Sequence, residues 1–174
     1  MDGERGRRIL MTLILGVAAL LAALEVTLAR GSDRTLGPSA PRLAPLEDMD
    51  RALAEGDLVS AATARHRAHL AALGSRSWEG FLAVGDAALR LGDASGDRAR
   101  MKPEARRAYL AALMRARSER SLDGVLRATE SFAVIGDREM VEQGIRIARD
   151  VAGRDDLAQE RIATLAGIWI DELL

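Results

Sequence analysis

Two histidines are the first residues in this sequence whose spacing is compatible with metal binding. His66 and His69 lie three residues apart, so on a helix they face the same way. A zinc site needs at least a third protein ligand, and the neighbouring Arg65 and Arg67 repel a cation. We therefore interpret both histidines as surface residues.

A short acidic segment offers a second candidate for metal binding. Asp93, Ser95, Asp97 and Glu104 occupy positions 1, 3, 5 and 12 of the calcium-loop template. That template requires a glycine at position 6, where this sequence has Arg98. We expect a polar connection between two helices here, and no metal or other cofactor.

The sequence shows no established catalytic motif. It contains no cysteine, no glycine-rich phosphate loop and no nucleophile elbow. Asp155 and Asp156 are better explained as the start of a helix, where the helix dipole favours negative charge and Gln159 completes a capping box with Asp156. We expect a protein that is not an enzyme and has no small-molecule substrate. The alternative is a membrane-anchored enzyme that cleaves glycans with two carboxylates.

Composition limits the fold and the partners. The chain has 174 residues, a net charge of −1 and a pI near 6.2, which gives no basis for a nucleic-acid partner. Apolar residues make up 48% of the sequence but aromatic residues only 3%. The core must therefore be built from alanine, leucine, isoleucine and valine.

Residues 9–29 form an apolar segment long enough to cross a bilayer. Its arginine-rich tail, residues 1–8, predicts a cytoplasmic N-terminus, although basic residues on both sides nearly balance. The segment from residue 30 onward would then lie outside the cytoplasm, on the periplasmic side of a bacterial inner membrane. The alternative is a cleaved signal peptide, because Thr27 and Ala29 resemble a weak cleavage site.

Small residues within this apolar segment recur at spacings that allow two membrane helices to pack closely. Their number also reflects the abundance of alanine throughout the chain. The candidate contact residues, together with the single carboxylate of the segment, are Gly16, Ala18, Ala19, Ala22, Ala23 and Glu25.

Residues 30–44 contain prolines and glycines without an apolar period, so we expect an extended linker. The remainder, residues 45–174, has no strand pattern and predicts an all-α domain of about seven helices. Pairs of glycine and aspartate at 56 and 57, 92 and 93, and 136 and 137 are expected to separate successive helices. The predicted helices cover residues 45–55, 57–73, 77–91, 103–117, 121–135, 138–152 and 156–174.

Residues 45–152 resemble the tetratricopeptide repeat, a 34-residue helix-pair unit. The resemblance is carried by Trp78, Gly85 and Ala87 in one helix, by the turn expected at Gly92 and Asp93, and by Ala105, Tyr109 and Ala112 in the next helix. About eight extra residues separate these two helices, and the proline between repeats is missing. The resemblance implies a right-handed solenoid with a concave protein-binding surface. Its expected core residues are Trp78, Phe81, Gly85, Gly92, Ala105, Tyr109, Phe132 and Gly136.

Two surfaces are candidates for partner binding. The basic residues Arg106, Arg107, Arg115, Arg117 and Arg120 form either a solvated face or a docking surface for an acidic partner. The apolar C-terminal end either folds back over the last helix pair or packs on another protein. Its residues are Ile168, Trp169, Ile170, Leu173 and Leu174.

Together these features predict a single-pass membrane protein that acts as a scaffold. We expect an accessory subunit that stabilises a larger membrane complex, respiratory or photosynthetic, with membrane lipid and other subunits as its partners. The alternative is a free periplasmic assembly factor or chaperone, because the repeat family includes anchored proteins that assist cytochrome assembly or a secretion channel.

Overall fold

A computed structural model describes residues 44–75, 77–171 and 173. The predicted tail, the predicted membrane segment at residues 9–29 and the linker up to residue 43 lie outside these residues, as does Leu174. Within the described part of the chain, no helix is long and apolar enough to cross a membrane.

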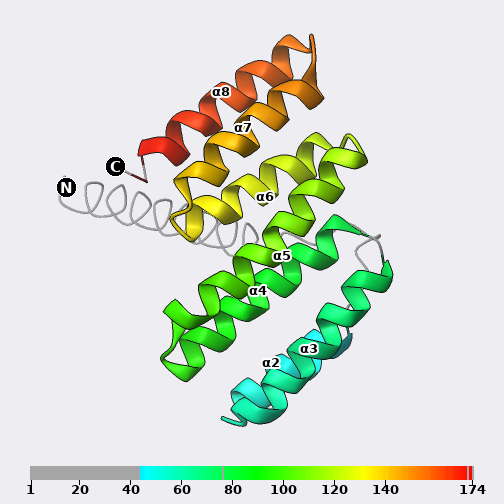
Figure 1. The fold of residues 1–174 in the computed structure, drawn as a ribbon, viewed down its shortest axis with the longest axis vertical. Coiled ribbons are helices and arrows are strands. Elements are labelled where there is room, and N and C mark those ends of the chain that lie inside the picture. The colour runs from blue at the N-terminus through cyan, green and yellow to red at the C-terminus, as the bar shows by residue number, and fades with distance from the viewer. Residues whose placement is uncertain (1–43, 76, 172, 174) are drawn as a thin grey trace, which may run out of the picture. The chain divides into compact units, whose positions relative to one another are not determined.

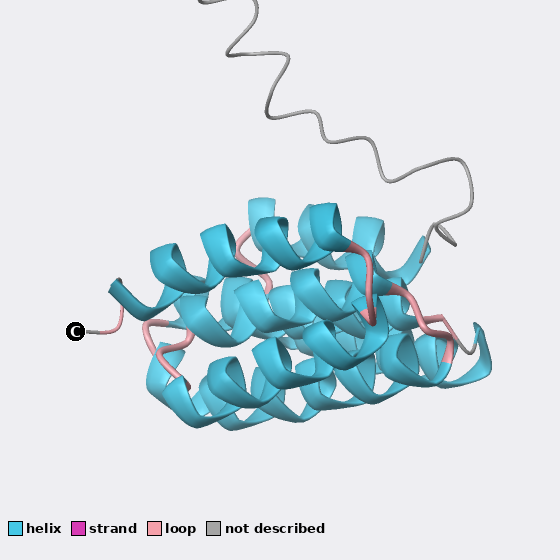
Figure 2. Cartoon of the chain, turned by 90° about the horizontal axis from the view of Figure 1, so that it is seen from above, coloured by secondary structure: helices cyan, strands magenta, loops and turns pink. Residues whose placement is uncertain are grey.

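The described residues form helices joined by short turns, without strands, which confirms the all-α prediction (Figure 2). Six of the helices were predicted with boundaries within about four residues. The exception is the helix predicted at 103–117, which begins five residues earlier. The helices are α2 (Ala44–Ala54), α3 (Leu58–Ser75), α4 (Trp78–Ser95), α5 (Arg98–Ser118), α6 (Leu122–Val134), α7 (Arg138–Ala152) and α8 (Asp156–Asp171).

The helices pack in chain order, each against the one before and the one after it (Figure 1). In addition α2 approaches α4, α4 approaches α6, and α6 approaches α8, so the even-numbered helices form one layer. In the odd-numbered layer, α5 approaches α7. Helices therefore meet near neighbours in the sequence, as in repeat proteins whose units stack along one direction.

Alanine forms much of the core, as the composition predicted. The buried side of α3 consists of Ala61, Ala64, Ala68 and Ala72, each at most 1% exposed. Larger side chains fill the centre of the stack, where Tyr109 and Phe132 are almost fully buried. Of the expected core residues, those buried are Trp78, Phe81, Gly85, Gly92, Ala105, Tyr109 and Phe132.

Some of these helices approach each other closely because a glycine, which has no side chain, lies at the contact. A methyl group on Gly85 of α4 would overlap the ring of Tyr109 from α5. On Gly124 of α6 it would lie 2.7 Å from Ala116 Cβ and 2.9 Å from the Trp78 ring. Close packing between helices therefore requires glycine at both positions.

The turns repeat at a regular interval. Gly56, Gly96 and Gly136 all have a left-handed backbone, with φ of 75°, 69° and 74°, and each lies 40 residues after the last. Gly136 is thus a turn residue, as its pairing with Asp137 predicted, and it is exposed although it was also expected in the core. An L-amino acid with a side chain is strained in this conformation, which explains the glycine.

The expected turn at Gly92 and Asp93 is wrong. Both residues lie inside α4, which continues to Ser95, and the turn falls at Gly96. Gly92 instead allows the start of α5 to pack on α4, because a Cβ there would lie 2.9 Å from Arg98 Cα. Directly after this turn α5 begins at Arg98, and it includes Pro103, which was expected to open the helix.

The start of α8 differs from its predicted cap. Asp155 Oδ1 accepts a hydrogen bond from Ala158 N at 3.1 Å, which confirms an aspartate as the capping residue. Gln159 was expected to complete a capping box. Its Nε2 instead donates to the carbonyl oxygens of Arg149 and Gly153, at 3.1 and 2.8 Å, and so joins α8 to the end of α7.

Candidate binding surface

Ion pairs connect successive helices of the even-numbered layer. Arg90 of α4 lies 3.2 Å from Asp50 of α2, and Arg161 of α8 lies 3.4 Å from Asp123 of α6. All four side chains are about half exposed. Both pairs therefore lie on the surface and span neighbouring helices of one layer.

The two inner helices of this layer carry the same pattern. Asp86 and Arg90 are four residues apart on α4, and Asp123 and Arg127 are four residues apart on α6, so each pair shares one helix face. Arg127 is close enough to Asp86 to lower the pKa of its carboxyl group. We call the resulting line the charged row; it consists of Asp50, Arg90, Asp86, Arg127, Asp123 and Arg161.

Asp86 is the most perturbed carboxyl group of the charged row. Its Oδ1 accepts a hydrogen bond from the Tyr109 hydroxyl at 2.8 Å. Burial of the carboxyl group raises the pKa of Asp86, while the bond from Tyr109 and the charges of Arg90 and Arg127 partly oppose this shift. The residue as a whole remains exposed, so the desolvation acts on a carboxylate whose outer side still faces solvent.

Tyr109 reaches this carboxylate from inside the core. Its ring passes beside Gly85 and meets Phe132 edge to face, with ring centroids 6.0 Å apart. Burial and the neighbouring Asp86 raise the pKa of Tyr109, so the phenol stays protonated and donates. The core thus fixes the orientation of Asp86.

Arg127 is held by an aromatic contact as well as by charge. Its guanidinium carbon lies 5.7 Å from the centroid of Trp78, within the range of a cation–π interaction. Trp78 is itself 8% exposed and packs beside Gly124. The middle of the charged row therefore rests on α4, α5 and α6 together.

The ion pairs of the charged row add little to stability. Exposed ion pairs contribute about 0–1 kcal/mol each. Because each pair is weak, its carboxylate or guanidinium group can leave its present ion-pair partner for another group of the same charge as that partner at little cost in free energy. The alternation of signs along the row makes it complementary to a polypeptide that carries both signs.

The five candidate arginines of the α5 region do not form one surface. Arg106 pairs with Asp137, Arg107 with Glu104, and Arg115 with Glu119. Arg106 and Arg117 lie eleven residues apart on one side of α5, whereas Arg115 lies on another. Arg120 has a left-handed backbone, with φ of 53°, in the turn before α6. Contact of these arginines with an acidic partner therefore stays a prediction.

The apolar C-terminal helix folds back on the stack. Trp169 is 5% exposed and belongs to the main core, and Ile170 and Leu173 pack against it. Of the two alternatives for this end of the chain, the packing of Trp169 in the core corresponds to folding back over the last helix pair. Ile168, which is 49% exposed, remains on the surface.

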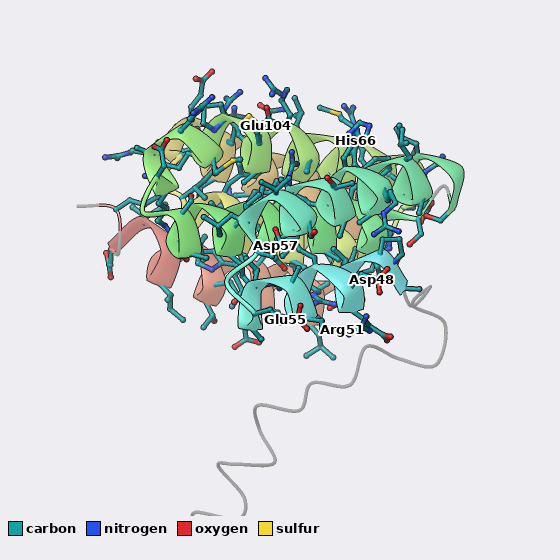
Figure 3. All side chains as sticks on the ribbon, turned by 90° about the horizontal axis from the view of Figure 1, so that it is seen from below. Asp48, Arg51, Glu55, Asp57, His66 and Glu104 are labelled. Atoms are coloured by element: carbon teal, nitrogen blue, oxygen red, sulfur yellow. The ribbon has the colours of Figure 1, made fainter. Side chains whose placement is uncertain are left out.

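The metal-binding candidates are not assembled into a site. No group of three potential ligands lies together among the described residues. The calcium template fails because α4 and α5 extend into it, and each of its carboxylates has an arginine nearby: Asp93 has Arg98, Asp97 has Arg100 and Glu104 has Arg107. His66 is exposed on α3, as expected, and His69 is partly exposed (Figure 3).

Comparison with known proteins adds no relative from which a function could be transferred. No family model matches the sequence, and no curated protein or solved structure shows significant similarity to it.

The charged row was missed by the motif search. Its members lie on four helices, and the bond from Tyr109 to Asp86 joins residues 23 apart in the sequence. One signal was present: an aspartate followed four residues later by an arginine occurs at 86 and 90 and again at 123 and 127.

Proposed function

We propose that this protein is a non-enzymatic scaffold that binds other proteins through the charged row of its helical stack. The main support for this proposal is that ion pairs and charges of alternating sign run across α2, α4, α6 and α8 on exposed surface. The buried contacts of the stack are apolar, so these charged side chains are available to a partner.

The architecture supports a repeat protein of the tetratricopeptide-like type. Its helices stack as pairs, and the even-numbered layer corresponds to the first helices of such pairs. The interval of 40 residues between turn glycines is longer than the 34 residues of that family. We therefore propose a right-handed helix-pair solenoid whose repeat unit is 40 residues long.

The scaffold is proposed to be anchored in a bacterial inner membrane by residues 9–29, with its helical domain on the periplasmic side. There it serves as an accessory subunit that stabilises a larger membrane complex. The support for the anchor is the length and apolarity of that segment. Replacing Ala19 and Ala23 by leucine is expected to weaken retention in the complex while leaving the helical domain folded.

Exchanging charges tests the charged row without breaking its ion pairs. The double variant Asp123→Arg with Arg161→Asp keeps an ion pair between α6 and α8 but reverses its direction. A matched control exchanges Arg138 and Glu142, a pair 3.1 Å apart on α7. Both proteins are extracted in mild detergent and passed through size exclusion, and the co-migrating subunits are identified.

The first variant is expected to lose subunits that the wild type and the control retain at constant ratio. If the wild type migrates alone, it is not a subunit of a stable complex. Subunits retained equally by all three proteins would exclude the charged row as the contact.

Two other functions were considered. A free assembly factor would associate transiently, so its partners would be recovered at variable ratios. A glycan-cleaving enzyme needs a second carboxylate close to the raised one. The groups that act on Asp86 are instead Tyr109, Arg90 and Arg127.

A further inference from the structure

The odd-numbered layer contains a gap. Helices α5 and α7 approach each other, as do all successive helices of the even-numbered layer. Between α3 and α5, both described in full, no Cα atoms come within 8 Å. The regular stack is therefore open at this one step between α3 and α5.

A groove of about 490 Å³ occupies this opening. One wall belongs to α3, the floor to the end of α4, and the other wall to the start of α5. Its volume lies within the range of about 300–1,000 Å³ that is typical of ligand pockets. The residues that line it are Leu58, Ala62, Arg65, Leu91, Ser95, Asp97, Arg100, Met101 and Glu104.

The charged side chains that line the groove differ in whether they have an ion-pair partner. Asp97 lies 3.9 Å from Arg100, and Glu104 is paired with Arg107. Arg65 has no ion-pair partner among the described residues. Its Nε is buried without a hydrogen-bond partner. Arg65 therefore offers a ligand a guanidinium charge that no carboxylate of the described residues already pairs with.

The remaining lining is apolar. Leu58 and Ala62 of α3 face the groove opposite Met101 of α5, with Leu91 below. Helix α3 contains no acidic residue, so nothing on that wall would repel an anion. Glu104 and His66 lie along one side of the molecule, and Asp48 and Arg51 of α2 lie away from it (Figure 3).

We propose that the groove between α3 and α5 binds a peptide segment that carries a carboxylate next to aliphatic side chains. The carboxylate accepts hydrogen bonds from the guanidinium group of Arg65, and the aliphatic side chains lie on Leu58, Leu91 and Met101. Arginine suits this role because its planar group can bind both oxygens of a carboxylate. This inference rests on the proposed function, since it adds a peptide site to the scaffold.

Fluorescence polarisation on the full-length protein in detergent tests the site. The probe is a labelled Ala-Ala-Leu-Leu peptide with a free C-terminal carboxylate, compared with the same peptide ending in an amide. We expect the free carboxylate to bind at least tenfold more tightly. Arg65→Gln should remove this difference, and Ala62→Phe should block both peptides by filling the groove.

Arg67→Gln is the matched control, because Arg67 lies on the same helix but pairs with Asp48, 3.5 Å away. It should leave binding unchanged. Arg65→Lys keeps the charge without the planar guanidinium group and should restore only part of the affinity. Thermal unfolding followed by circular dichroism checks that each variant is folded.

Equal binding of the two peptides, or no effect of Arg65→Gln in a folded protein, would overturn the proposal. So would loss of peptide binding in the Asp123 and Arg161 exchange, which would place the peptide on the charged row. A dimer in light scattering that Arg65→Gln dissociates would show that a second copy fills the groove. Co-migration of subunits is measured separately, so either idea can fail without the other.

Discussion

Arg106 of α5 donates its Nε hydrogen to Oδ2 of Asp137, the residue that caps α7, over a distance of 2.5 Å. The other oxygen of the same carboxylate accepts from Met140 N at 3.2 Å, inside the first turn of α7. One side chain therefore both starts a helix and joins it to the previous helix of the odd-numbered layer.

Replacing Asp137 separates these two roles. Asp137→Ala should lower the free energy of unfolding by about 1–2 kcal/mol, because it removes the cap as well as the ion pair. Asp137→Asn keeps an oxygen for Met140 N and should cost less than about 1 kcal/mol. Urea unfolding followed by circular dichroism measures both, and equal losses would contradict the capping role.

Gly85 should tolerate no side chain. Gly85→Ala should destabilise the protein by about 1–3 kcal/mol, because its methyl group overlaps the ring of Tyr109. Gly167, inside α8, has nothing within 4 Å of its Cβ position, so Gly167→Ala should stabilise by about 0.5–1 kcal/mol. Thermal melts of the two variants should shift in opposite directions, and a neutral Gly85→Ala would refute the close approach.

Asp86 should make stability depend on pH. Because its pKa is raised in the folded state, its contribution is fully present below about pH 3.8, the ordinary value, and is lost as the pH rises through the raised value. Asp86→Asn still accepts the hydrogen bond from Tyr109 but carries no charge. The variant should therefore gain stability relative to the wild type as the pH rises from 3 to 7.

Chemical unfolding at several pH values measures this difference. Asp150→Asn, at an exposed position on α7, is the control for removing a charge from the surface. A relative stability of Asp86→Asn that falls as the pH rises would show that the carboxylate is favoured by its surroundings.

Adjacent residues of α8 should respond differently to truncation. Trp169→Ala should cost about 3–5 kcal/mol because it leaves a cavity in the core. Ile168→Ser, at a surface position, should change stability by no more than about 0.5 kcal/mol. Guanidinium unfolding distinguishes the two, and a small effect at Trp169 would mean that α8 does not cover the stack in solution.

The sequence was most informative where one short segment contained all the signals for a helix boundary. The helix predicted at residues 138–152 has the observed bounds because Gly136 ends one helix and Asp137 begins the next. Around residue 92, glycine precedes aspartate twice, one helical turn apart. The local pattern does not distinguish the two pairs; in the structure Gly92 packs against the start of α5, and the second pair, Gly96 and Asp97, forms the turn.

Contacts between distant residues could not be predicted in this way. The orientation of Asp86 depends on Tyr109, which reaches it only because α5 packs across Gly85. The groove at Arg65 depends on the spacing of α3 and α5, and no local pattern encodes that distance. The burial of Trp169 follows from how α8 returns to the stack, which the apolar sequence left open.

The α2 and α3 pair is joined to α4 in part through a small core cluster of its own, in which four of six side chains are alanines: Met49, Ala52, Ala61, Ala64, Ala87 and Leu91. A methyl group offers little contact area, so this joint resists shear weakly. Because α3 is also a wall of the groove, a shift at this joint would change the width of the groove and leave the charged row between α6 and α8 in place.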